Sequence, residues 1–198
     1  MTRLLFLDID GVLNDHSRHP NGYSGLQARP VAILNKLLAE IPEMQLVISS
    51  AWRYLVYNGQ MTTAGLESLF MTHGLDCKGR VHGLTDTDEN AGGFDGNQTQ
   101  DEWYAWITHN GARVRREQIK AAVAGKSPIC YAVVDDLALD MPRLVQTDSN
   151  VGLTEEQAGR IKQLLHDQVT LAEALGLSAP GGDGLPNKVK LYFPRNSR

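Results

Sequence analysis

The chain has 198 residues, of which 42% are hydrophobic and 21% are charged, and its formal net charge is −4. These values describe a globular protein with one ordinary core, and they argue against an extended, strongly basic surface for polyanions. No apolar run approaches the roughly 20 residues of a membrane-spanning helix, and no signal segment precedes the first predicted strand. We therefore expect a cytoplasmic protein without a membrane partner.

The first predicted strand is the apolar run Leu4–Leu7, which suits the interior of a parallel sheet because both faces of such a strand are buried. Asp8 and Asp10 follow this run, and Gly11 breaks it. An unpaired ionised carboxylate inside the sheet would be very costly. We therefore expect both carboxylates at the carboxyl end of the strand, where open α/β sheets place their ligand crevices.

This segment resembles the first motif of the haloacid dehalogenase (HAD) superfamily, a hydrophobic strand followed by Asp-x-Asp-Gly. The resemblance implies that Asp8 is a nucleophile and that Asp10 is a general acid and base. An Asp at position 10 is the acid expected of the phosphatases of the superfamily, and the dehalogenases lack it.

The rest of the chain alternates between strand-like and helix-like segments, which predicts βαβ units and an α/β fold with a doubly wound, mainly parallel, Rossmann-like sheet. The predicted elements are a helix from Pro30, a strand at 45–50, a helix at 64–73, a strand at 81–85, a helix at 117–124, a strand at 129–134 and a long helix from Thr154 to Gly176. Residues 1–177 are assigned to one HAD-like domain with a small insert or minimal cap at about 86–111. Residues 178–198 are assigned to a Pro/Gly-rich, weakly basic tail.

The second predicted strand ends in Ser49 and Ser50 and continues as Ala-Trp-Arg. This Ser-x-Trp-Arg ending resembles one HAD subgroup, the phosphatase-like domains of Swiss Army Knife RNA repair proteins, and weaker echoes of it extend over residues 3–165. The resemblance implies that the Ser50 hydroxyl binds the phosphate, with Ser49 as the runner-up, and that Arg53 contacts the substrate. An ordinary salt bridge is the alternative for Arg53.

The third motif of the superfamily is a Lys or Arg near a helix start, and here several basic residues compete for it. Arg115 has the matching offset from Ile119 and is our choice, with Arg116 and Lys120 as alternatives. An Arg suits this role because its planar fork binds phosphate through two hydrogen bonds. A solvated basic helix face explains at least two of these residues equally well.

The predicted strand at 129–134 ends in Asp135 and Asp136, which resembles the fourth motif of the superfamily. In that fold these residues crowd the same crevice as Asp8 and Asp10. Two like charges about 4 Å apart repel by roughly 4 kcal/mol at an effective dielectric of about 20, so the cluster requires a cation or protonation. Oxygen ligands favour Mg²⁺. The resemblance implies that Asp8, a carbonyl of Asp10, and Asp135 or Asp136 hold this ion, and a metal role for Asp140 stays open.

Together these motifs predict a Mg²⁺-dependent phosphohydrolase that acts on a phosphate monoester through a phosphoaspartate. The subgroup resemblance implies a nucleotide or a terminal phosphate of RNA or DNA as the substrate. Trp103 and Trp106 could stack on bases, although packing of the insert on the core explains them as well. The alternatives are a noncatalytic protein that binds metal or phosphate and a phosphatase of small metabolites.

Overall fold

The computed structural model describes residues 3–14, 25–86, 100–124 and 130–167, and the side chains of 100–109 are not part of that description. The insert residues 87–99, the tail at 178–198 and the last part of the predicted final helix lie outside the described residues. The elements in chain order are β1 (Arg3–Leu7), α1 (Ala28–Glu40), β2 (Met44–Ile48), the 3-10 turn η1 (Ala51–Arg53), α2 (Tyr54–Tyr57), α3 (Thr63–Thr72), β3 (Val81–Leu84), α4 (Gln100–Ala124), β4 (Cys130–Asp135), β5 (Leu144–Gln146) and α5 (Glu155–His166).

The five strands form one sheet in the order β3-β2-β1-β4-β5, and every pair of neighbouring strands is parallel. The predicted α/β class and doubly wound sheet are confirmed. The short edge strand β5 was not predicted, because three residues are too few to show an alternating pattern.

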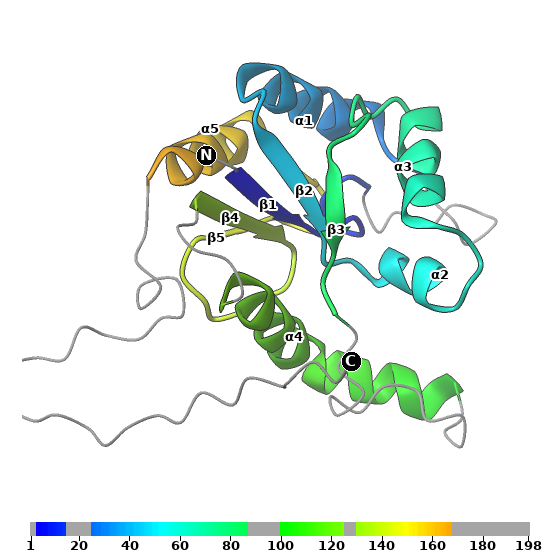
Figure 1. The fold of residues 1–198 in the computed structure, drawn as a ribbon. Helices are drawn as coiled ribbons and strands as arrows, with labels where there is room; N and C mark the ends of the chain where they lie inside the picture. Colours follow the sequence, from blue (N-terminus) through cyan, green and yellow to red (C-terminus); the bar gives the residue numbers. More distant parts are fainter. Residues whose placement is uncertain (1–2, 15–24, 87–99, 125–129, 168–198) are drawn as a thin grey trace, which may run out of the picture.

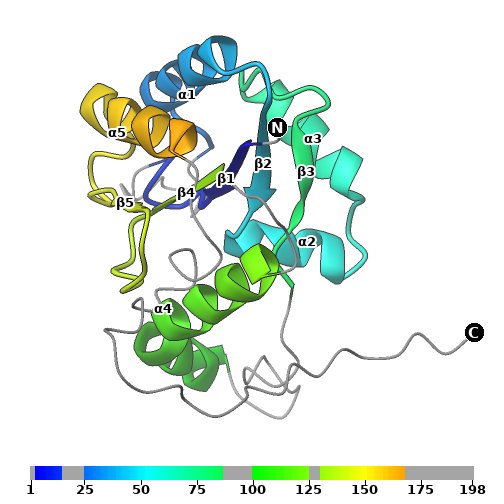
Figure 2. The same cartoon turned by 60° about the vertical axis from the view of Figure 1, so that its left-hand side comes forward.

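Helices cover both faces of the sheet, with α1 and α5 on one side and α4 on the other (Figures 1 and 2). Side chains alternate between the faces along each strand. Leu5 and Leu7 of β1 pack in a core with α1, α3 and α5, whereas Leu4 and Phe6 pack in a second core with Ile119 of α4. Helix α4 therefore covers the face of the sheet toward which the even-numbered residues of β1 project.

The strands are in register at their carboxyl ends, which point toward α2 and α4 in both views (Figures 1 and 2). Leu7 pairs with Ile48 and with Val134, and Ile48 pairs with Leu84. The next residue of each strand therefore lies at one level across the sheet. These four residues, called the polar row below, are Thr85, Ser49, Asp8 and Asp135. By the alternation of side chains, the row faces α4.

Helix α4 is longer than the sequence predicted, since it begins at Gln100 and not at Glu117. Its first half contains Gly111, which disfavours a helix by about 1 kcal/mol relative to Ala and interrupts the apolar pattern. The predicted insert at 86–111 therefore includes helix from Gln100 onward.

Helix α5 starts as predicted, with a capping box formed by Thr154 and Gln157, and ends at His166. Cys77 and Cys130 are both buried. In the part of the chain that the structure covers, none of the helices has the length and apolar character needed to cross a membrane.

Candidate active site

Two hydrogen bonds hold the carboxylate of Asp8 at the centre of the polar row, one from a backbone N–H and one from an arginine side chain. Asp8 is only 2% exposed. Its Oδ1 accepts a hydrogen bond from the N–H of Ile9 at 2.9 Å, and its Oδ2 accepts one from Nη1 of Arg115. Two fixed donors leave this carboxylate little freedom to rotate.

Arg115 connects the ends of β1 and β4. The same Nη1 that reaches Asp8 lies 3.0 and 2.9 Å from the two carboxylate oxygens of Asp135, whose Oδ1 also accepts from the N–H of Leu137 at 3.0 Å. Among the predicted basic residues that the structure describes, Arg115 is thus the one that contacts Asp8 and Asp135. It comes from α4, on the face of the sheet to which the polar row projects.

The charges of this group shift the pKa values of its members. Burial first and the charge of Asp8 second raise the pKa of Asp135 to about 7, against the opposing effect of Arg115. Burial would lower the pKa of the Arg115 guanidinium, but Asp8 and Asp135 outweigh it, so this pKa lies above its ordinary value. One guanidinium therefore does not neutralise the negative charge of the site.

The residues present fit a divalent cation. One carboxylate oxygen each of Asp8, Asp135 and Asp136 lie within 4.8 Å of one another. Three carboxylates are hard oxygen ligands of the kind that Mg²⁺ prefers, and the raised pKa of Asp135 indicates that further positive charge would stabilise the ionised cluster. Asp8, Asp135 and Asp136 are therefore the residues that would hold the metal.

Asp10 lies on the loop after β1 and is oriented by two side chains that the sequence did not single out. Nε1 of Trp52 donates to its Oδ2 at 3.1 Å and its Oδ1 at 3.2 Å, and Nδ2 of Asn14 donates to Oδ1 at 2.9 Å. The loop itself is fixed by Thr147, whose Oγ1 donates to the carbonyl of Gly11 at 2.8 Å. In the sequence, Trp52 is only a part of the Ser-x-Trp-Arg motif by which the family is identified. Its position beside the predicted phosphate-binding serines is the signal that could have indicated a role in the site.

The two serines after β2 differ in their relation to Asp8. Ser49 belongs to the polar row, and its Oγ is buried without a hydrogen-bond partner among the described residues. Ser50 lies one position further on, and its Oγ accepts from the N–H of Trp52 at 3.4 Å. The hydroxyl of Thr85, in the same row, is also buried and unpartnered within the described chain.

Arg53 points into the protein and is only 4% exposed. Its Nη1 donates to the carbonyls of Ser49 and Ser50 at 2.6 and 2.8 Å, and its Nη2 donates to Oε1 of Gln118 at 2.8 Å. Burial lowers the pKa of this guanidinium. Arg53 thus ties the segment after β2 to α4, three residues beyond Arg115. The link to Gln118 could not be read from the sequence, because it joins residues 65 positions apart.

The remaining basic candidates lie further from the acidic cluster. Arg116 contacts Glu117 at 2.9 Å and the exposed Asp140 at 3.4 Å, while Lys120 lies 3.7 Å from Glu117. With Gln146 they line a groove of about 690 Å³. The groove adjoins the acidic cluster, since Gln146 donates to the carbonyl of Asp136 at 3.0 Å.

Trp103 and Trp106 belong to the first half of α4, three residues apart and therefore on neighbouring positions of one helix face. Their side chains lie outside the described part of the structure. Their proposed stacking on bases stays a prediction.

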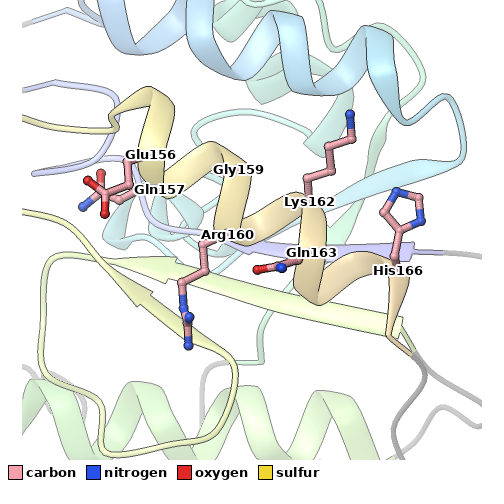
Figure 3. Close-up of a pocket in the computed structure, with 7 residues that line it drawn as sticks. All are labelled: Glu156, Gln157, Gly159, Arg160, Lys162, Gln163 and His166. Atoms are coloured by element: carbon pink, nitrogen blue, oxygen red, sulfur yellow. The ribbon is translucent and has the colours of Figure 1, made fainter.

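A separate hollow of about 670 Å³ lies along α5, and all of its lining residues, among them Glu156, Arg160 and His166, come from that helix (Figure 3). None of the acidic residues described above lines it. The candidate active site is therefore at the carboxyl ends of the strands and not in this hollow.

A parallel, doubly wound α/β domain with Asp-x-Asp-Gly after its first strand and a second acid pair after β4 belongs to the class of HAD-like domains. Comparison with protein-family models matches residues 4–158 to the HAD domain in Swiss Army Knife RNA repair proteins, and the chain belongs to this family. Comparisons with curated proteins and with solved structures returned no match. Family membership points to hydrolase activity of the phosphatase type, and HAD enzymes in general use a divalent metal ion.

Proposed function

We propose that the protein is a Mg²⁺-dependent phosphatase that hydrolyses phosphate monoesters through a phosphoaspartate on Asp8. The observation that carries the proposal is the acidic cluster at the carboxyl edge of the sheet, bridged by Arg115, with Asp10 two residues beyond the nucleophile. A purely structural ion pair would not need a third carboxylate, Asp136, within 4.8 Å of the other two.

The chain supplies the groups for two successive displacements. Asp8 attacks phosphorus, so that an Oδ–P bond forms while the bond to the leaving oxygen breaks. Asp10 gives its proton to that oxygen and thereby releases a neutral alcohol. Asp10 then removes a proton from water, and the resulting hydroxide attacks the phosphoaspartate, which releases phosphate and restores Asp8. Dividing the reaction in this way replaces one difficult step by two easier ones.

Positive charge and hydrogen-bond donors would bind the phosphoryl oxygens. When bound, Mg²⁺ supplies charge that offsets the charge of the transferring group. Arg115 would hold both the phosphoryl group and Asp8, because its guanidinium already reaches that carboxylate. For the hydroxyl, the register favours Ser49 over Ser50, our first choice from the sequence, because Ser49 stands beside Asp8 in the polar row.

For the substrate we propose a nucleotide or a phosphorylated end of RNA or DNA. The family name supports this class, since the matched family is described from RNA repair proteins. The groove lined by Arg116 and Lys120 supports it too, because it offers space beside Asp136 for the part of the substrate beyond the phosphate.

The proposal is tested by assaying the purified chain with Mg²⁺ against p-nitrophenyl phosphate, nucleotides, sugar phosphates and oligonucleotides carrying a 3′- or 5′-phosphate. We expect hydrolysis, with the highest kcat/KM on nucleotides or oligonucleotide ends. Asp8→Asn keeps the side-chain shape and should abolish turnover while the protein stays folded. Mg²⁺-dependent turnover by Asp8→Asn would exclude the phosphoaspartate, and an inactive wild-type protein that still binds Mg²⁺ would favour a noncatalytic role.

A further inference from the structure

The carboxylate of Asp10 is held between two side-chain donors on different segments. Trp52 belongs to η1, after β2, and its indole Nε1 lies 3.1 and 3.2 Å from the two carboxylate oxygens. Asn14 lies on the same loop as Asp10, and its Nδ2 lies 2.9 Å from Oδ1. The side chain that must exchange protons with the substrate and with water is thus oriented from two sides.

Both donors are themselves fixed by the surrounding structure. Trp52 is 7% exposed, and its ring packs against Phe70 of α3 with ring centroids 5.8 Å apart. Asn14 is 2% exposed, and its Oδ1 accepts a hydrogen bond from the N–H of Gly11 at 3.0 Å. Because both donors are immobile, they also restrict the motion of the carboxylate. Asp10 therefore loses little conformational entropy when it reaches the reacting geometry.

The chemistry of these donors suits a residue that orients an acid. An indole N–H and an amide NH₂ donate hydrogen bonds but do not accept a proton at neutral pH. They can therefore fix the direction of the Asp10 carboxyl group without competing for the proton that it carries. A histidine or a carboxylate in either place would take part in the proton transfer.

We propose that Trp52, together with Asn14, is a positioning residue that aims Asp10 at the leaving oxygen of the substrate. The inference rests on the proposed phosphatase function. In the step concerned, the P–O bond breaks, its electron pair stays on the leaving oxygen, and the proton of Asp10 moves to that oxygen. This transfer matters most for a poor leaving group such as an alcohol, and least for p-nitrophenol, which leaves readily as its anion.

The test is the dependence of the phosphoryl-transfer rate on the leaving group. Trp52→Phe keeps an aromatic ring beside Phe70 and removes the N–H donor together with part of the ring volume. Release of the leaving group is followed in a single turnover for p-nitrophenyl phosphate, phenyl phosphate and an alkyl phosphate. General acid catalysis typically contributes about 10²- to 10⁴-fold, so loss of its orientation should remove a part of that factor. We expect a loss of about tenfold or more on the alkyl phosphate and less than about threefold on p-nitrophenyl phosphate, since only the former needs the acid.

Two further variants separate positioning from packing. Phe70→Leu loosens the same aromatic contact but leaves the indole N–H, so its losses should be alike on all three substrates. Asn14→Ala removes the second donor to Asp10, together with the acceptor for Gly11, and introduces no titratable group, so its losses should show the same leaving-group dependence as those of Trp52→Phe. Equal losses on every leaving group, or no loss, in both donor variants of an active enzyme would overturn the inference. A wild-type protein that hydrolyses none of these esters would instead refute the proposed function, on which the inference depends.

Discussion

Gly11 and Asp136 approach each other so closely that a Cβ atom on Gly11 would stand 2.6 Å from Oδ2 and 2.8 Å from Cβ of Asp136. Gly11 also has a φ of +76°, a left-handed conformation that costs an L-residue roughly 1–2 kcal/mol. The loop that carries Asp10 therefore packs directly against Asp136, one of the three carboxylates of the candidate metal site.

Gly11→Ala should weaken Mg²⁺ binding because the added methyl group displaces Asp136 from Asp8 and Asp135. Gly79→Ala is the matched control, since Gly79 has a φ of +69° and no atom within 4 Å of the added Cβ. Both variants should lose stability in thermal unfolding. Only Gly11→Ala should lose about tenfold in Mg²⁺ affinity, equivalent to about 1.4 kcal/mol, in a calorimetric titration. Equal Mg²⁺ affinities of the two variants would contradict the role of this contact.

Removal of the metal should stop the reaction. We expect EDTA to abolish hydrolysis of p-nitrophenyl phosphate and Mg²⁺ to restore it. Ca²⁺ should inhibit, because its larger and more flexible coordination shell can take both oxygens of Asp8 and so misalign the nucleophile. Full activity with Zn²⁺ but not with Mg²⁺ would count against a site made of carboxylate oxygens.

The raised pKa of Asp135 makes the stability of the metal-free protein depend on pH. Between the ordinary value of 3.8 and the folded value of about 7, the folded state keeps a proton that the unfolded state has released. The contribution of Asp135 to the free energy of unfolding is therefore complete below about pH 4 and is lost as the pH rises through 7. Asp135→Asn should flatten this decline, measured by urea unfolding in EDTA between pH 5 and pH 8.

Asp140→Asn serves as the control for that measurement, because its side chain is 96% exposed. It should leave the slope of stability against pH as in the wild type. Mg²⁺ should reduce the decline in the wild-type protein, since it favours the ionised carboxylate. An unchanged slope in Asp135→Asn would show that this carboxyl is not the group that titrates.

Arg53 should matter for stability more than for substrate affinity, in contrast to the substrate contact that the sequence predicted. Arg53→Lys cannot make the contacts of the fork to Ser49, Ser50 and Gln118, and buried carbonyls left without a donor cost about 1–3 kcal/mol. Chemical unfolding should show a loss of that size, whereas Arg29→Lys, at an exposed position, should show almost none. A raised KM with unchanged stability would support substrate contact instead.

The aromatic residues at the start of α4 provide the test of substrate class. If Trp103 or Trp106 stacks on a base, replacing it with Ala should lower kcat/KM on an oligonucleotide end by roughly tenfold, or about 1.4 kcal/mol. Hydrolysis of p-nitrophenyl phosphate should change much less. Equal losses on both substrates would identify these residues as structural.

The sequence predicted those parts of the site that a short local pattern encodes. Asp8 and Asp135 each follow an apolar run, so the strand, its end and the buried acid could be recognised together. Arg115 followed from its offset to Ile119. These predictions were possible because strand order and parallel register bring the ends of β1 and β4 together in this fold.

The contacts that orient the site were not predictable in the same way. Trp52 and Asp10 are 42 residues apart, and Thr147 and Gly11 are 136 apart. Such pairs depend on how loops meet after the strands are assembled, and neither periodicity nor composition records them. For the two serines, the family motif favoured Ser50, whereas only the register of β1 against β2 shows that Ser49 is the neighbour of Asp8.

The polar row also determines where the domain can tolerate a change of length. Neighbouring strands are about 4.8 Å apart, so the sheet itself spaces the side chains of the row. One residue added within β1 would move Asp8 out of line with Ser49 and Asp135 and reverse the faces of the residues after it. A residue inserted between Pro42 and Glu43, before β2 and near the amino ends of the strands, would leave the row intact. Evolution can therefore change the length of the loops at the amino ends of the strands while the residues at the carboxyl ends keep their arrangement.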